Sequence, residues 1–223
     1  MLAIFKREFK SYFQNVIGWL FVAALLAVYG LYFYVYNLKN GYPYISYDLK
    51  GIGFIMMIAV PILTMRSLSD EKKTKTDQLM LTSPVSVGRI VAGKYLAMAA
   101  VYTIDIALFA LSPLVLSIYG KVALSEAYVA LFGYWLYGLS CIAVGLFISS
   151  ISESVIISAI LTFAALFISY MMQSITGLIS SSGNMLTKVL NCFDLYTPFE
   201  NFVSGCFSVT SAAYYVTVIL LLC

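Results

Sequence analysis

One stretch of the sequence partly matches a phosphate-binding loop. Residues 88–94, GRIVAGK, fit the GxxxxGK part of a P-loop, in which backbone amides and a lysine hold phosphates. The next residue is Tyr95, whereas a P-loop needs Ser or Thr there to hold magnesium and must join a buried strand to a helix. Here the motif opens an apolar run, so we instead expect Arg89 and Lys94 to anchor the inner end of a membrane helix among lipid headgroups.

The residue types exclude most catalytic sites. The chain has no histidine, so Ser-His-Asp catalysis, Cys-His catalysis and an HExxH zinc site cannot be built. No two of its four cysteines (Cys141, Cys192, Cys206 and Cys223) have CxxC spacing, which disfavours a metal or redox site. Cys141 is expected to pack as a small hydrophobe, and a disulfide between Cys192 and Cys206 is a minor alternative. We predict that the chain is not an enzyme and has no cofactor-binding or metal site.

Asp105 is the one acid that we predict to lie deep within a membrane span. It follows Lys94 by about three helical turns, near the bilayer midplane. A buried carboxylate is costly in lipid and usually faces a bundle interior or a wet cavity. Two interpretations stay open, namely a pathway or proton-relay group and a structural carboxylate bonded to a Tyr or Thr of a neighbouring helix. A single intramembrane acid is weak support for ion coupling.

The composition indicates an all-α integral membrane protein. Of the 223 residues, 62% are hydrophobic and only 10% are charged, whereas a soluble domain typically has roughly 25% charged residues. The net charge of +3 is too small and dispersed for nucleic-acid binding. The apolar runs predict about six transmembrane helices, at residues 16–36, 51–66, 88–118, 125–149, 154–173 and 211–223. The last run would rise only ~20 Å against a ~30 Å hydrocarbon core, so the sixth span looks truncated.

Three segments outside these spans carry a recognisable pattern. Residues 2–14 alternate apolar and basic positions at helical spacing, which predicts a helix lying in the inner membrane interface. Residues 67–84 are strongly polar, and Ser69 or Asp70 is expected to cap a short helix there. Such a helix suits docking of a soluble partner, whereas a solvated loop is the alternative interpretation. Residues 174–207 are expected to form short helices at the outer leaflet.

The basic residues set the predicted orientation. With the N-terminus inside, the inner segments hold nine lysines and arginines and the outer segments hold four. Because basic residues favour the cytoplasmic side, the N-terminus and residues 67–84 are predicted to be cytoplasmic. We see neither an internal repeat nor a soluble domain boundary, so residues 1–223 are treated as one transmembrane domain.

Several stretches resemble the ABC-2 type permease family, most closely the branch named for gliding-motility-associated permeases. The most specific stretch is PILTMRSLSDEKKTKTDQLMLTSP at 61–84, followed by VAGKYL at 91–96. Supporting matches are FKREFKSYF at 5–13, GLFISS at 145–150 with the Ser-Glu that follows, and FENF at 199–202. The resemblance therefore covers nearly the whole chain.

The resemblance implies the permease subunit of an ATP-driven exporter, coupled to a separate ATP-binding subunit that holds ATP and magnesium. Residues 67–84 would be a coupling helix inserted into a groove of that subunit, with Glu71 pairing with a partner arginine. The residues implied in this contact are Arg66, Asp70, Glu71, Thr76, Leu79 and Pro84. The turn at 149–153 would make a second cytoplasmic contact through Ser150 and Glu153. The outer segment that contains Glu200 would cap the pathway.

The resemblance also implies an assembly and a location. Two permease subunits, identical or paralogous, would face each other in the bacterial cytoplasmic (inner) membrane, with two ATP-binding subunits below. An auxiliary extracytoplasmic protein is a further candidate partner, and nucleic acid is not. Two alternatives stay open, a membrane anchor that recruits a partner without transport and an ion-coupled secondary transporter.

Overall fold

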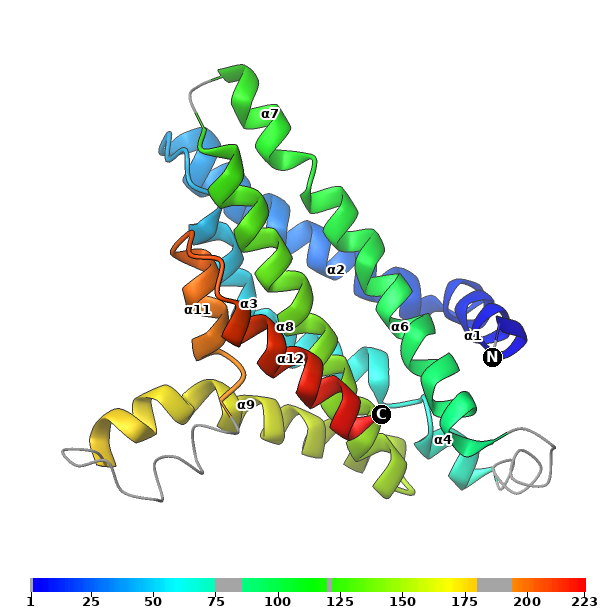
Figure 1. The fold of residues 1–223 in the computed structure, drawn as a ribbon. Coiled ribbons are helices and arrows are strands. Elements are labelled where there is room, and N and C mark those ends of the chain that lie inside the picture. Colours follow the sequence, from blue (N-terminus) through cyan, green and yellow to red (C-terminus); the bar gives the residue numbers. More distant parts are fainter. Residues whose placement is uncertain (1, 75–85, 120–121, 180–193) are drawn as a thin grey trace.

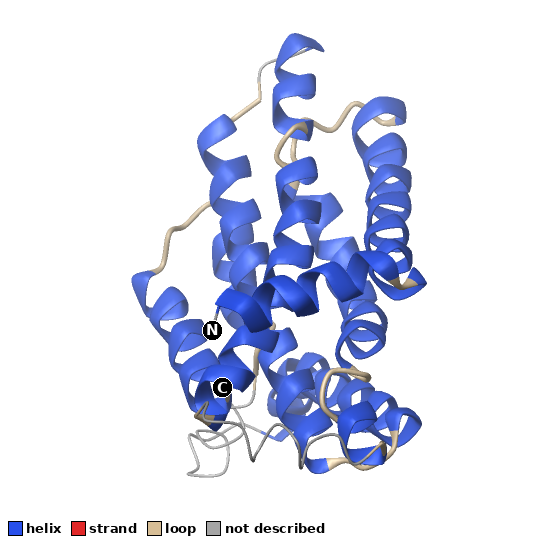
Figure 2. Ribbon diagram, turned by 90° about the vertical axis from the view of Figure 1, so that its right-hand side faces the viewer, coloured by secondary structure: helices blue, strands red, loops and turns tan. Residues whose placement is uncertain are grey.

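The chain folds as a bundle of helices. The computed structural model describes residues 2–74, 86–119, 122–179 and 194–223, and within these ranges no strand occurs (Figure 2). Among the described residues, five helical stretches are long and apolar enough to cross a membrane, and one apolar helix is shorter. The all-α membrane architecture predicted from composition is therefore confirmed. The five stretches are Val16–Lys39, Ser46–Lys73, Val87–Ile118, Leu124–Ile151 and Val155–Met172, and the shorter helix is α12, Val209–Leu222.

Helix α8 (Leu124–Ile151) is the centre of the bundle. It packs against α3 (Ser46–Thr64), α6 (Val87–Phe109), α9 (Val155–Ile179), α11 (Thr197–Val203) and α12 (Figure 1). Small residues let neighbours approach its backbone closely, as is common between membrane helices. A Cβ atom at Gly138 would lie 2.3 Å from the ring of Tyr102, and one at Gly145 would lie 2.5 Å from the Thr64 hydroxyl. Cys141 lies fully buried in this core, as expected for a small hydrophobe.

The N-terminal helix is present as predicted. Helix α1 (Leu2–Gln14) packs against α6 and against α2 (Val16–Phe33). It is seen nearly along its axis in Figure 1, while α2 and α6 extend across the view, so it lies crosswise to both spans. On one side it carries a row of phenylalanines, in which the Phe5 and Phe9 rings lie 5.8 Å apart and the Phe9 and Phe13 rings 5.0 Å apart. This arrangement fits a helix at the membrane interface.

Several boundaries differ from the predicted ones. Helix α3 begins at Ser46 rather than near residue 51, because its acid Asp48 is buried against Asn37 of η1 (Tyr34–Lys39), a π-helix that continues α2. The third span keeps its predicted extent, Val87–Ile118, but consists of two helices, because α6 ends at Phe109 and α7 (Ser112–Tyr119) follows it. Helix α9 continues to Ile179, so residues 174–179 prolong a span and do not begin a separate outer helix. A short helix does form further on, as α11.

Candidate functional site

Polar contacts concentrate where the short helix α4 (Ser69–Lys73) meets the ends of longer helices. It follows α3 after a tight turn and lies beside the end of α8 and the start of α9 (Figure 1). A helix of five residues is too short to be stable in isolation, because nucleation is costly and few hydrogen bonds offset it. Contacts with the rest of the chain must therefore hold it in place.

The first of these contacts centres on Lys94 of α6. Its side chain is only 2% exposed, and its ammonium lies 2.6 Å from the Glu71 carboxylate and 3.5 Å from that of Glu8. It also donates a hydrogen bond to the Ser67 carbonyl, at 2.9 Å. Three acceptors thus surround a group that has three N–H donors. We refer to Lys94, Glu71, Glu8 and Ser67 as the Lys94 cluster.

The Lys94 cluster corrects one expectation and adds an internal contact to one predicted residue. Lys94 was expected to reach lipid headgroups together with Arg89, but only Arg89 is exposed, because two carboxylates and a carbonyl hold Lys94 inside the bundle. The partner arginine that the resemblance implies for Glu71 stays a prediction, and within this chain the Glu71 carboxylate contacts Lys94. Residues 88–94 lie within helix α6, so they form no phosphate-binding loop.

The second contact supplies the cap of α4. Neither of the predicted residues, Ser69 and Asp70, caps this helix. Leu68 occupies the N-cap position and makes no side-chain hydrogen bond, and the Ser69 hydroxyl donates to the Met65 carbonyl. Instead, the backbone amides of Leu68 and Ser69 both donate to the hydroxyl of Ser149, each at 3.2 Å. The acceptor therefore comes from α8, because α8 ends beside the first turn of α4.

A third contact ties α4 to the same end of α8. The Lys72 ammonium donates a hydrogen bond to the Ser150 carbonyl. The Ser150 hydroxyl donates to the Phe147 carbonyl of its own helix, at 2.6 Å. Glu153, in the turn after α8, is exposed. Of the two residues predicted for a second cytoplasmic contact, Ser150 therefore touches α4 through its main chain, and Glu153 presents its side chain at the surface.

Two further predicted residues, Arg66 and Asp70, are exposed beside the Lys94 cluster. Both line a polar cavity of about 480 Å³ between α1, α4 and α6. Thr76, Leu79 and Pro84 lie outside the described residues. So does Cys192, and with it the predicted disulfide to Cys206.

Three functional contacts were not predicted from the sequence: Glu8 as a partner of Lys94, Lys72 as a donor to α8, and Ser149 as the cap of α4. A signal for Glu8 existed, since it is an acid in an otherwise basic polar face of α1. The neighbouring Tyr12 hydroxyl contacts the Leu63 carbonyl of α3 at 3.4 Å. Burial, and then the nearby Glu8 carboxylate, raise the pKa of Tyr12 above its ordinary value, so this phenol stays a neutral donor.

Asp105 lies buried in the middle of α6, but among the described residues it lacks the hydrogen bond to a Tyr or Thr that the structural interpretation requires. Neither of its carboxylate oxygens has a hydrogen-bond partner among the described residues, and the same holds for the buried Tyr134 hydroxyl. The nearby Tyr102 hydroxyl donates to the Tyr134 carbonyl, at 2.7 Å. Buried polar groups are normally paired, so this part of the core contains acceptors that the described side chains do not satisfy.

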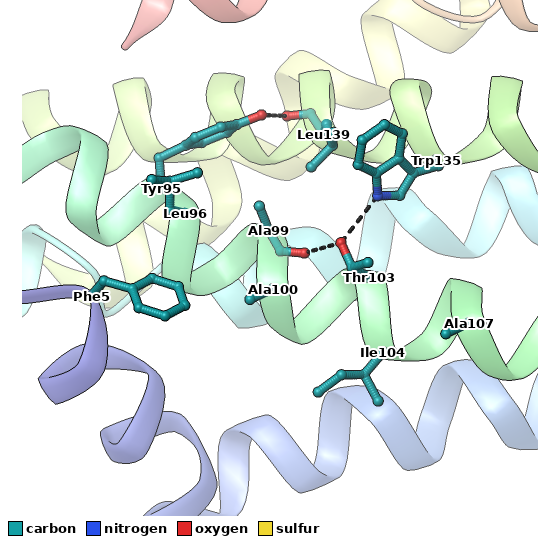
Figure 3. A pocket seen from close by; sticks show the side chains of 10 residues that line it. All are labelled: Phe5, Tyr95, Leu96, Ala99, Ala100, Thr103, Ile104, Ala107, Trp135 and Leu139. Carbon is teal, nitrogen blue, oxygen red and sulfur yellow. Dashed lines mark hydrogen bonds between the residues drawn. The ribbon is translucent and has the colours of Figure 1, made fainter. Parts of the chain in front are cut away.

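An apolar groove of about 740 Å³ runs between α1, α6 and α8 (Figure 3). Its polar wall groups are bonded to one another. Trp135 donates to the Thr103 hydroxyl at 3.1 Å, and the Tyr95 hydroxyl donates to the Leu139 carbonyl at 3.2 Å. Asp105 is not among the residues that line the groove. The groove therefore presents an almost wholly apolar surface, separate from the buried carboxylate.

The far end of the bundle carries an exposed ion pair. Glu200 of α11 lies 3.9 Å from the ammonium of Lys50 in α3, and both side chains are partly exposed. This is the predicted outer residue, and its ion pair links α11 to the second span. An exposed pair at this distance is weak compared with the Lys94 cluster.

Comparison with known proteins agrees with this architecture. A search of curated proteins found no significant match. Residues 8–223 match the family model described as ABC-2 family transporter protein. The match spans nearly the whole chain, including α4, the Lys94 cluster and every membrane-length helix. The chain therefore belongs to the ABC-2 family of transporter proteins.

Proposed function

We propose that this chain is the permease subunit of an ATP-driven exporter, and that α4 receives the motion of a separate ATP-binding subunit. Membership of the ABC-2 family supports a membrane transport component that is not itself catalytic. ATP and magnesium would bind to the partner chain. We also propose that the chain is a member of the branch named for gliding-motility-associated permeases, which its sequence resembles.

The observation that carries the proposal is the attachment of α4. A solvated loop that only joined two spans would need no buried contacts. Here the helix is held through Lys94 on one side and through Ser149 and the Ser150 carbonyl on the other. A short polar helix fixed firmly to two longer ones, α6 and α8, can pass a displacement on to them, which a mobile loop cannot.

The exposed side of this region supplies the proposed docking surface. Arg66, Asp70 and Glu153 are exposed at the same end of the bundle. Thr76, Leu79 and Pro84 of the 67–84 segment join the proposed contact through the family resemblance. Charged groups at the rim and an apolar anchor such as Leu79 would give the mixed character usual for protein interfaces.

The proposal extends to the other permease subunit, the membrane location and the pathway. A second permease subunit, identical or paralogous, would complete the pathway in the bacterial cytoplasmic membrane, with the N-terminus in the cytoplasm. Asp105 is proposed to lie along or beside the pathway, because its carboxylate, which no described residue hydrogen-bonds, invites water or a passing polar group. Glu200 and α11 are proposed to close its outer end, where an auxiliary extracytoplasmic protein could bind.

The test is affinity purification of the chain from its native membrane in mild detergent, followed by mass spectrometry. We expect an ABC-type ATP-binding subunit to co-purify in roughly equal amount. The exposed-charge reversal Asp70→Lys should reduce that amount by at least about tenfold, since interface charges at a docking rim affect association strongly. The matched control Glu126→Lys reverses an exposed acid on the first turn of α8, away from α4, and should leave it unchanged. Absence of any ATP-binding subunit in the unmodified sample would overturn the proposal.

A further inference from the structure

The Lys94 cluster joins parts of the chain that are distant in sequence. Glu8 comes from α1, Ser67 from the turn after α3, and Glu71 from α4, whereas Lys94 lies about two turns into α6. Lys94 and Glu71 are 23 positions apart in the chain. One ammonium group therefore contacts the interfacial helix, the short polar helix and a membrane span at once.

The charges in and beside the cluster balance each other. The Glu8 oxygen that faces Lys94 also accepts a hydrogen bond from Arg7, at 2.7 Å, so two acids meet two bases. The side chains of Glu8 and Glu71 are 16% and 19% exposed, against 2% for Lys94. When one member of such a shielded group is removed, the remaining charges are left without compensation, and the local structure loosens. Lys94 thus fixes where α1 and α4 lie relative to α6.

Helix α4 is also attached to α8, by a second set of contacts. The Ser149 hydroxyl accepts from the Leu68 and Ser69 amides, and the Ser150 carbonyl accepts from Lys72. Helix α4 is therefore attached to α8 by main-chain and hydroxyl hydrogen bonds and to α6 and α1 by charge. Of these attachments, the charged one alone reaches α1, because the bonds to Ser149 and Ser150 involve no residue of that helix.

We propose that Lys94 is the positioning residue that makes α1, α4 and the start of α6 move as one body, so that the interfacial helix follows a displacement of α4. This inference rests on the proposed function, because it takes α4 as the element that the ATP-binding subunit moves. Lys94 acts only through α1 and α4. Helix α1 therefore changes position during the transport cycle, together with α4.

The experiment uses the full chain in its co-purified complex with the ATP-binding subunit, reconstituted in lipid. It compares Lys94→Met, which removes the charge, with Lys94→Arg, which keeps it. The matched control is Arg89→Met, which removes an exposed cation of the same helix. Two quantities are measured for each variant. The first is hydrogen exchange of the peptides covering residues 2–14 and 66–74. The second is release of inorganic phosphate by the complex, relative to the isolated ATP-binding subunit.

In Lys94→Met we expect both peptides to exchange about tenfold faster, because their shared attachment is lost. The effect of the permease on phosphate release should fall at least about fivefold, the size of a typical coupling between sites. Lys94→Arg should stay within about twofold of the unmodified chain on both measures, since the positive charge and several N–H donors remain. Arg89→Met should change neither.

Two outcomes would overturn the inference. One is unchanged exchange of the two peptides in Lys94→Met, which would show that Lys94 does not hold α1 and α4. The other is faster exchange with an unchanged effect on phosphate release, which would show that the attachment does not transmit motion. Should Lys94→Met fail to fold, Glu71→Gln removes the opposite charge at nearly constant size, and the same two criteria apply to the 66–74 peptide. If the unmodified chain brings no ATP-binding subunit, the proposed function fails, while the exchange data still decide whether Lys94 holds the two helices.

Discussion

Lys94 and Asp105 are buried charged residues of the same helix, about 16 Å apart along its axis, and their surroundings are opposite. The Lys94 ammonium has three acceptors within 3.5 Å. Neither oxygen of Asp105 has a hydrogen-bond partner among the described residues. A buried charged group that has partners, such as Lys94, connects several helices, because each partner belongs to another part of the chain. Burial without partners marks a place that water or a passing molecule must satisfy, at a cost in stability.

The largest expected effect comes from removing Lys94. Lys94→Met should lower the free energy of unfolding by about 3 kcal/mol, since breaking a buried pair leaves its partners uncompensated. Thermal unfolding of the purified chain in detergent measures this loss. The triple variant Lys94→Met, Glu8→Gln, Glu71→Gln removes the three charges of the Lys94 cluster, leaves only the exposed Arg7 beside it, and should recover most of the loss. No difference between the single and triple variants would contradict the view that Lys94 is held by its charge partners.

Asp105 should respond with the opposite sign. Asp105→Leu removes an unpartnered carboxylate from the core and should raise the free energy of unfolding by about 1–2 kcal/mol. The same detergent unfolding experiment measures the gain, with Asp105→Asn as the size-matched comparison. If Asp105→Leu instead destabilises the chain by as much as Lys94→Met, the carboxylate has a partner and the contrast between the two residues disappears.

Ser149 tests the uncharged attachment of α4. Ser149→Ala removes the acceptor of the Leu68 and Ser69 amides and should cost about 1 kcal/mol, the usual value of a helix cap. Hydrogen exchange of the 66–74 peptide should rise correspondingly. The control Ser150→Ala removes a hydroxyl that bonds only its own helix in the structure and keeps the carbonyl that accepts from Lys72, so it should have little effect. Equal effects of the two variants would argue against the cap.

The smallest effect is expected at the end of the bundle where Lys50 and Glu200 lie. Lys50→Met breaks the 3.9 Å contact with Glu200, but both side chains are partly exposed. Exposed pairs contribute about 0–1 kcal/mol, and thermal unfolding should change little. A loss as large as that of Lys94→Met would show that exposure does not separate the two ion pairs as argued above.

Most helices could be predicted from the sequence, whereas most contacts of the site could not. Long apolar runs and the phenylalanine spacing of α1 are local signals, and both gave the right elements. The start of α3 was placed too late, because Asp48 resembles a loop residue until its partner Asn37 is known. The end of α9 was placed too early for a similar reason, since Gln173 and Ser174 interrupt the apolar run without ending the helix.

Within the site, residue types were informative but their partners were not. The charges of the 67–84 segment marked α4 as special, and Lys94 stood out in a false phosphate-binding motif. The bond between Leu68 and Ser149, however, spans 81 positions of the chain. No local pattern connects such residues, because helix propensity and hydropathy describe each segment alone.

By itself, the sequence determined the class of this protein. Its apolar runs require lipid, its lack of histidine removes whole groups of catalytic sites, and its polar 67–84 segment separates two spans. Only the tertiary structure decided that Lys94 points inward to Glu8 and Glu71 and not to headgroups, and that Asp105 is buried with no hydrogen-bond partner in the described part of the chain. The physical reason is that hydropathy is a property of each residue, whereas the pairing of a buried charge depends on which helices pack beside it.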